Sequence, residues 1–150
     1  MKKLHDLTIK KFHDGLLNKE FSALEMTREI FKWIENRDEE IGAYLNLNRD
    51  RALEQAEKSD VAVAKGEPLS AVSGVPIAFK DNMLIEGLPA TSASKILKDY
   101  VASYDASVIS KLKKSGAVFL GKTNMDEFAM GSSTENSAFG PTKNPLDLTR

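Results

Sequence analysis

Apolar residues in the first third of the chain recur every three or four positions, the spacing of amphipathic helices. A first segment is predicted to end near Asn18. A capping box at Ser22–Glu25 is predicted to start a second helix, and an alanine-rich helix is expected from Asn48 to about Lys65. The apolar face of the first segment consists of Ile9, Phe12 and Leu16. That of the second helix consists of Met26, Ile30, Trp33 and Ile34.

The pattern changes after Gly66-Glu67-Pro68. Val72–Phe79 and Ala117–Gly121 are short apolar runs and predict two strands. Between them Asp105 is expected to N-cap a helix with Val108, Ile109 and Leu112 on its apolar face. Strand, helix, strand predicts an α/β fold. We therefore divide the chain into an N-terminal helical region, residues 1–67, and the start of an α/β core, residues 68–150.

Beyond Lys122 the pattern predicts a short helix capped by Thr123 or Asn124, with Asp126 and Glu127 solvated at its start. Loops follow to Arg150. Two strands are too few for an independent sheet, so the chain resembles the start of a larger fold. We therefore expect exposed apolar faces at Val75, Ile77, Val118 and Leu120, and either a marginal or aggregating monomer or dependence on another chain that completes the sheet.

Composition narrows the class of protein. The 150 residues carry a net charge of -1 with 41% hydrophobic and 29% charged residues, a soluble balance that does not favour unaided nucleic-acid binding. The chain has no cysteine, which excludes disulfides and thiolate chemistry. His5 and His13 alone do not predict a metal site. With no apolar signal or membrane segment evident, we expect a cytoplasmic protein.

Lys80 is the strongest candidate for chemistry. It ends the apolar run Val72–Phe79, where a lysine can lose its proton near neutral pH and act as a base. The alternative is an ion pair with Asp81 or another carboxylate. No serine lies in a Gly-x-Ser-x-Gly elbow, and each of the loop serines fits a turn better than a nucleophile. Those serines are Ser92, Ser94, Ser132, Ser133 and Ser137.

Gly116–Thr123 matches the Gly-x-x-x-x-Gly-Lys-Thr pattern of a phosphate-binding loop. We reject that interpretation because Ala117–Leu120 is apolar enough to be a strand, whereas a phosphate loop is an exposed, glycine-rich turn.

Three segments resemble the amidase signature family. They are Gly74–Asn82, which resembles the family's catalytic-lysine segment, Ala117–Gly131, its following strand and loop, and Phe139–Pro145, the approach to its glycine- and serine-rich signature. The resemblance implies a mixed sheet covered by helices and a Ser-cisSer-Lys triad that hydrolyses amides. Lys80 would be the base, and Met130 and Gly131 would bind substrate. The bridging and nucleophilic serines would lie beyond Arg150, so we expect these 150 residues alone to be inactive.

Within the family, residues 124–137 are most similar to the tRNA-dependent amidotransferase branch. This implies glutamine as substrate and ammonia release for converting misacylated Glu-tRNA(Gln), or alternatively Asp-tRNA(Asn). It also implies a heterotrimer with two further subunits, B and C. ATP and Mg²⁺ would be used mainly in a partner subunit, and this chain would bind no cofactor. Two alternatives stay open, a general small-amide amidase and a non-catalytic interaction module.

Overall fold

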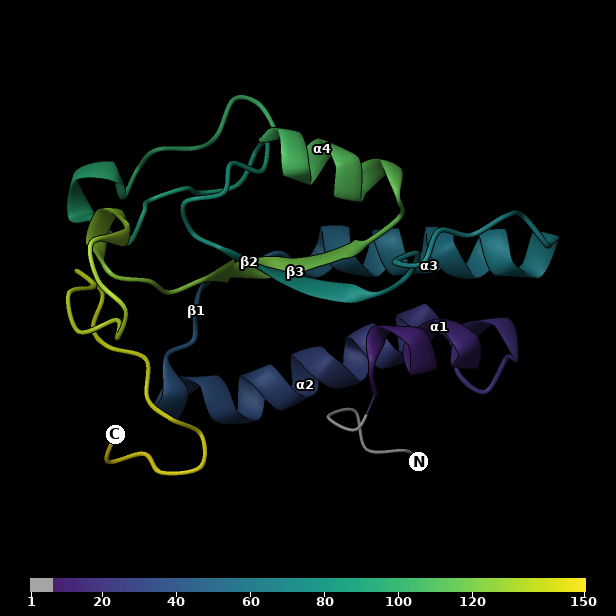
Figure 1. Ribbon diagram of the computed structural model, residues 1–150, viewed down its shortest axis with the longest axis horizontal. Coiled ribbons are helices and arrows are strands. Elements are labelled where there is room, and N and C mark those ends of the chain that lie inside the picture. Colours follow the sequence, from purple (N-terminus) through teal and green to yellow (C-terminus); the bar gives the residue numbers. More distant parts are fainter. Residues whose placement is uncertain (1–6) are drawn as a thin grey trace.

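Three strands form a mixed sheet in the computed structural model, which describes residues 7–150 (Figure 1). β1 (Tyr44–Leu47), β2 (Pro76–Lys80) and β3 (Val118–Thr123) lie in the order β1-β3-β2. β2 and β3 are parallel and β1 is antiparallel to β3. Helix α4 (Ser107–Lys114) connects β2 to β3, which confirms the predicted α/β fold. The sequence did not predict β1, because four residues are too short to show a clear alternation.

Helices cover both faces of the sheet (Figure 1). Val118 and Leu120 pack on one face against α1 (Ile9–Leu17), α2 (Ala23–Ile41) and α3 (Arg49–Lys65). Phe119 points to the other face, against Phe79 and Ile109 of α4, because successive side chains of a strand alternate.

The expected exposure of the apolar strand faces is therefore wrong. Val75, Val118 and Leu120 are buried and Ile77 is half-buried, because helices from both halves of the chain already cover the sheet. The division at residue 67 stays a prediction, although the helices before it share a core with the strands after it.

Two side chains cap the start of α2. The Ser22 hydroxyl accepts a hydrogen bond from the Glu25 N–H at 2.9 Å, as the predicted capping box requires. Asp60 of α3 accepts from the N–H groups of Ala23 and Leu24 at 2.7 and 3.0 Å. A carboxylate at a helix N-terminus is favourable, so Asp60 also fixes α3 against α2.

Replacing Ser22 with alanine is expected to lower the free energy of unfolding by about 1 kcal/mol, because the Glu25 N–H loses its acceptor. Ser22→Asp keeps an acceptor and serves as the matched control. Chemical denaturation of the intact protein measures both, and equal stabilities for the two variants would contradict the capping role.

Two predicted helix starts are wrong. The N-cap of α4 is Ala106, and the Asp105 carboxylate instead accepts from the Glu86 N–H and pairs with Lys113. No helix begins at Thr123 or Asn124, because β3 extends through Thr123. Single 3₁₀ turns lie at Lys95–Leu97 (η2) and Glu127–Ala129 (η3).

The first helical segment is confirmed as α1, with Asn18 at its C-cap. His5 lies outside the described residues, and His13 lies in α1. None of the helices in residues 7–150 is both long enough and apolar enough to cross a bilayer.

Candidate active site

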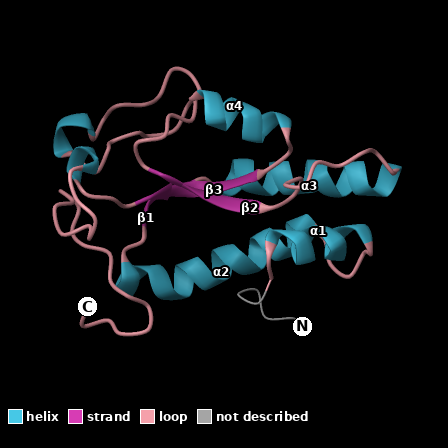
Figure 2. Cartoon of the chain, in the orientation of Figure 1, coloured by secondary structure: helices cyan, strands magenta, loops and turns pink. Residues whose placement is uncertain are grey.

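Lys80 is the last residue of β2, and its side chain is exposed. Its Cα pairs with Thr123 of β3, so Lys80 lies at the carboxyl end of the parallel strand pair. Figure 2 shows that the chain leaving this end is mostly loop. Asp81 pairs with Lys122 and not with Lys80, so the alternative of a Lys80–Asp81 ion pair does not hold. Among residues 7–150 the Lys80 ammonium group has no hydrogen bond or ion pair.

The buried lysine is Lys122. Its side chain is 0% exposed, and its Nζ lies 3.1 Å from the Asp81 carboxylate, which is 1% exposed. Nζ also donates to the carbonyl oxygens of Asp81 and Pro89. Burial lowers the pKa of Lys122, and the charge and hydrogen bond of Asp81 oppose that shift.

This arrangement confirms that Gly116–Thr123 is not a phosphate loop, because Val118–Thr123 is a strand and its lysine is buried. The sequence did not single out Lys122, because Gly121-Lys122-Thr123 was interpreted only as the end of a possible phosphate loop. The available signal was a lysine inside a run that otherwise reads as a buried strand.

The segment after β2 folds back onto Asp81. The second carboxylate oxygen of Asp81 accepts hydrogen bonds from the Thr91 N–H at 2.9 Å and from its hydroxyl at 2.5 Å. Ser92 and Ala93 then adopt positive φ angles of 50° and 53°. Such angles are unfavourable for residues other than glycine and persist only where surrounding contacts impose them.

The segment after β3 folds around Asp126. Its carboxylate accepts from the N–H groups of Ser133, Thr134 and Asn136 and from the Asn136 side chain, at 2.9 to 3.1 Å. The Thr134 N–H, with the bonds from Asn136 and Ser133, holds the pKa of Asp126 below its usual range, against the opposing effect of burial. The predicted solvated position is therefore wrong, because Asp126 is buried and organises this loop.

Met130 and Gly131 follow η3 directly. Met130 is 80% exposed, whereas a Cβ added to Gly131 would lie 2.5 Å from the Asp126 carboxylate carbon. Only glycine therefore fits at residue 131 without moving Asp126. Phe128 and Ala129 have positive φ angles, like Ser92 and Ala93. These four strained residues lie in the segments that follow β2 and β3, and strained residues often lie at functional sites. The role of Met130 and Gly131 in substrate binding stays a prediction.

Replacing Asp126 with asparagine is expected to destabilise the protein in a pH-dependent way. Because the folded pKa is lowered, the charged carboxylate stabilises the fold fully above its unfolded pKa of about 4 and loses this effect as pH falls through the folded pKa. Thermal unfolding of the intact protein from pH 2 to 7 should show a deficit for Asp126→Asn that closes in acid. Glu127→Gln is the control, and a deficit independent of pH would contradict the prediction.

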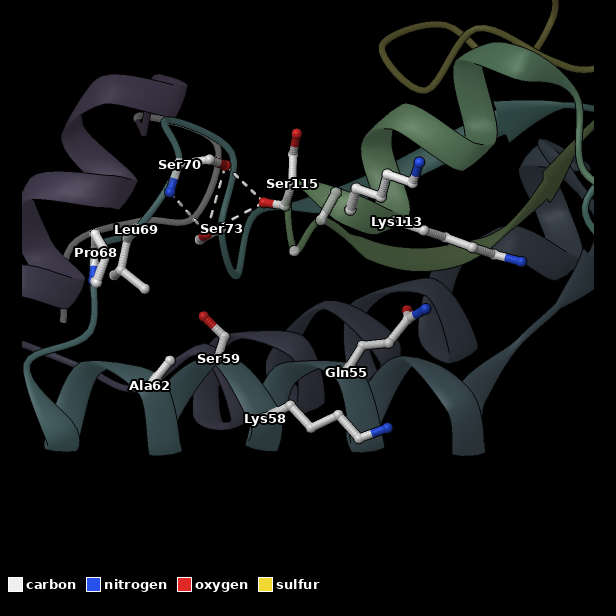
Figure 3. A pocket seen from close by; sticks show the side chains of 13 residues that line it. Gln55, Lys58, Ser59, Ala62, Pro68, Leu69, Ser70, Ser73, Lys113 and Ser115 are labelled. Atoms are coloured by element: carbon white, nitrogen blue, oxygen red, sulfur yellow. Dashed lines mark hydrogen bonds between the residues drawn. The ribbon is translucent and has the colours of Figure 1, made fainter.

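A cavity of about 520 Å³ lies elsewhere, between α3, the loop before β2 and the end of α4 (Figure 3). In Figure 3, Ser59 of α3 points toward the loop that carries Ser70 and Ser73. Gly116 and Ala117, just before β3, also line the cavity, so it lies at the opposite end of the strands from Lys80. Residues 7–150 contain no group of three His, Cys, Asp or Glu side chains arranged to hold a metal ion.

The chain matches known proteins over most of its length. The family model described as Amidase matches residues 25–150. The A subunit of the glutamyl-tRNA(Gln) amidotransferase of Desulfatibacillum aliphaticivorans is 52% identical over 147 residues, which cover 98% of this chain and 30% of that protein. The chain thus spans less than a third of that relative's length.

Two solved structures share the fold. One, described as a vestigial protein complex that reveals the evolutionary origins of an s-triazine catabolic enzyme, has a TM-score of 0.91 and 37% identity over 96% of this chain and 32% of that one. The other, the A subunit of the glutamyl-tRNA(Gln) amidotransferase of Thermotoga maritima, has a TM-score of 0.74 and 33% identity over 100% of this chain and 30% of that one.

Proposed function

Because this chain belongs to the amidase signature family, we propose that it is the amino-terminal part of the glutamine-hydrolysing subunit of a tRNA-dependent amidotransferase. The observation that carries the proposal is the exposed Lys80 at the carboxyl end of β2, which has no side-chain partner among residues 7–150 and lies beside the loops that follow β2 and β3. The 52% identity to the Desulfatibacillum protein supports this branch of the family.

In this proposal Lys80 acts as the base and takes a proton from a bridging serine, which takes one from a nucleophilic serine, both supplied by sequence after Arg150. The serine oxygen bonds to the amide carbon of glutamine and the C–N bond breaks. The proton taken by Lys80 returns to the leaving nitrogen, which departs as ammonia. Water then releases glutamate. Backbone N–H groups near the nucleophile would stabilise the oxyanion.

The ammonia would pass to a partner subunit in a cytoplasmic heterotrimer with subunits B and C, for amidation of misacylated tRNA. ATP and Mg²⁺ would be used mainly by that partner. Gly116–Thr123 is not proposed as a nucleotide site, because Val118–Thr123 is a strand and Lys122 is buried.

Ammonia release from glutamine tests the proposal. The intact protein, co-expressed with its partner subunits, should release ammonia, and residues 1–150 alone should release no more than their own Lys80→Ala variant. Ammonia from the short chain above that control would contradict the requirement for the later serines. An intact complex that leaves glutamine unchanged would contradict the proposed substrate.

A general small-amide amidase is the second candidate. The TM-score of 0.91 to the structure tied to an s-triazine catabolic enzyme exceeds the 0.74 to the Thermotoga protein, so the fold alone does not single out the tRNA-dependent branch. Efficient hydrolysis of small amides by the intact protein without partner subunits would support this candidate over the first.

A further inference from the structure

A buried polar network begins where Lys80 ends its strand. The next residue, Asp81, shares its carboxylate with Lys122 of the neighbouring strand, and Lys122 also holds the Pro89 carbonyl oxygen at 3.1 Å. Burying two charges is costly, and an apolar pair of similar volume is often as stable or more so. Stability alone is therefore a poor explanation for this pair.

The network continues through the Thr91 hydroxyl. That hydroxyl donates to Asp81 at 2.5 Å and accepts from the Ala93 N–H at 3.1 Å. It thus joins the ion pair to the strained turn at Ser92 and Ala93, whose positive φ angles need such external support.

The same turn holds the loop that carries Met130 and Gly131. The Ser92 carbonyl oxygen accepts from the Phe128 N–H at 2.9 Å, and the Ala93 carbonyl oxygen accepts from the Ala138 N–H at 3.0 Å. These two bonds lie on either side of Met130 and Gly131 in the sequence. A shift of the 92–93 turn would therefore move both ends of the loop.

Resting on the proposed function, we infer that Thr91, Asp81 and Lys122 are positioning residues that hold the loop of residues 126–138 in place relative to Lys80. Lys80 and Asp81 are adjacent in the chain, so the network that holds this loop begins at the residue next to Lys80. The ion pair holds Asp81 in place, and Asp81 holds Thr91. Thr91 in turn holds the turn at residues 92–93, to which the loop of residues 126–138 is hydrogen-bonded.

Thr91→Val tests the inference because it removes the hydroxyl at nearly constant volume. We expect kcat/KM for glutamine in the intact complex to fall about 10- to 100-fold, since a misplacement of about 1 Å can cost 100-fold. KM should rise as part of this loss, whereas a smaller folded fraction lowers kcat and leaves KM unchanged. Thr91→Ser restores the hydroxyl and should recover most of the activity.

Thr27→Val is the matched control, because the Thr27 hydroxyl lies in α2 and is buried with no hydrogen-bond partner in the described part of the chain. All variants are assayed well below their melting temperatures. Hydrogen exchange of peptides covering residues 126–138 provides a readout independent of activity, and should be faster in Thr91→Val than in Thr27→Val.

Unchanged exchange in Thr91→Val would overturn the inference, as would wild-type KM and kcat despite faster exchange. A Thr91→Ser variant as impaired as Thr91→Val would also overturn it, because the hydroxyl would then not be the active element. A wild-type complex with no activity toward glutamine or any small amide would overturn the proposed function and the catalytic half of the inference. The exchange data would still decide whether Thr91 holds the loop.

Discussion

Lys80→Ala is expected to reduce glutamine hydrolysis by the intact complex by about 10²- to 10⁴-fold, the usual contribution of a general base. The substitution should affect the reaction and not the fold, because Lys80 is exposed at the carboxyl end of β2 and its ammonium group has no partner among residues 7–150. Removing it leaves the fold's hydrogen bonds intact. Steady-state ammonia release, with melting temperatures measured in parallel, separates lost chemistry from lost folding.

Lys80→Arg sharpens this test, because arginine keeps the positive charge but cannot give up its proton in a protein. It should be as inactive as alanine if Lys80 acts as a base, and partly active if only its charge matters. Lys114→Ala is the control, since Lys114 is also exposed but lines the cavity at the other end of the strands. Activity of Lys80→Ala within about twofold of this control would rule out a base at residue 80.

Lys122→Met is expected to lower the free energy of unfolding by about 3–5 kcal/mol. The change leaves Asp81 buried and charged, with the Thr91 N–H and hydroxyl as its remaining side-chain partners within residues 7–150. It also removes the donor to the Pro89 carbonyl oxygen. Chemical denaturation of the intact protein measures the loss.

Lys114→Met is the matched control and should change stability by no more than about 0.5 kcal/mol, because its side chain is exposed. The double variant Asp81→Leu/Lys122→Met removes both charges and should recover part of the loss. Recovery stays partial because Thr91 loses its acceptor. If Lys122→Met were as stable as Lys114→Met, the buried pair would not contribute to stability as expected.

The sequence predicted those elements whose signals are local. The helices appear in the spacing of Phe12 and Leu16 and in the capping box at Ser22, and the parallel pair appears as two apolar runs around a helix. Lys80 could be singled out because a lysine at the end of an apolar strand is unusual. Each of these signals lies within a few residues of the feature that it predicts.

The rest depends on contacts between distant parts of the chain. Nothing near Lys122 shows that its partner is Asp81, and nothing near Asp60 shows that it caps α2. An aspartate at residue 126 is equally suitable for a helix start, and only the fold brings the N–H groups of Ser133, Thr134 and Asn136 around it. The strained turn at Ser92 and Ala93 likewise follows from Thr91 and Asp81, not from its own composition.

The strand order has a consequence for synthesis on the ribosome. β3 is the central strand but the last of the three to be made, and β1 and β2 are not neighbours in the sheet. Until Val118–Thr123 emerges, the earlier strands have no partner and the helices have no sheet to cover. Nascent chains from which Val118–Thr123 has not yet emerged therefore expose the most apolar surface, to which chaperones can bind and through which the chains can aggregate.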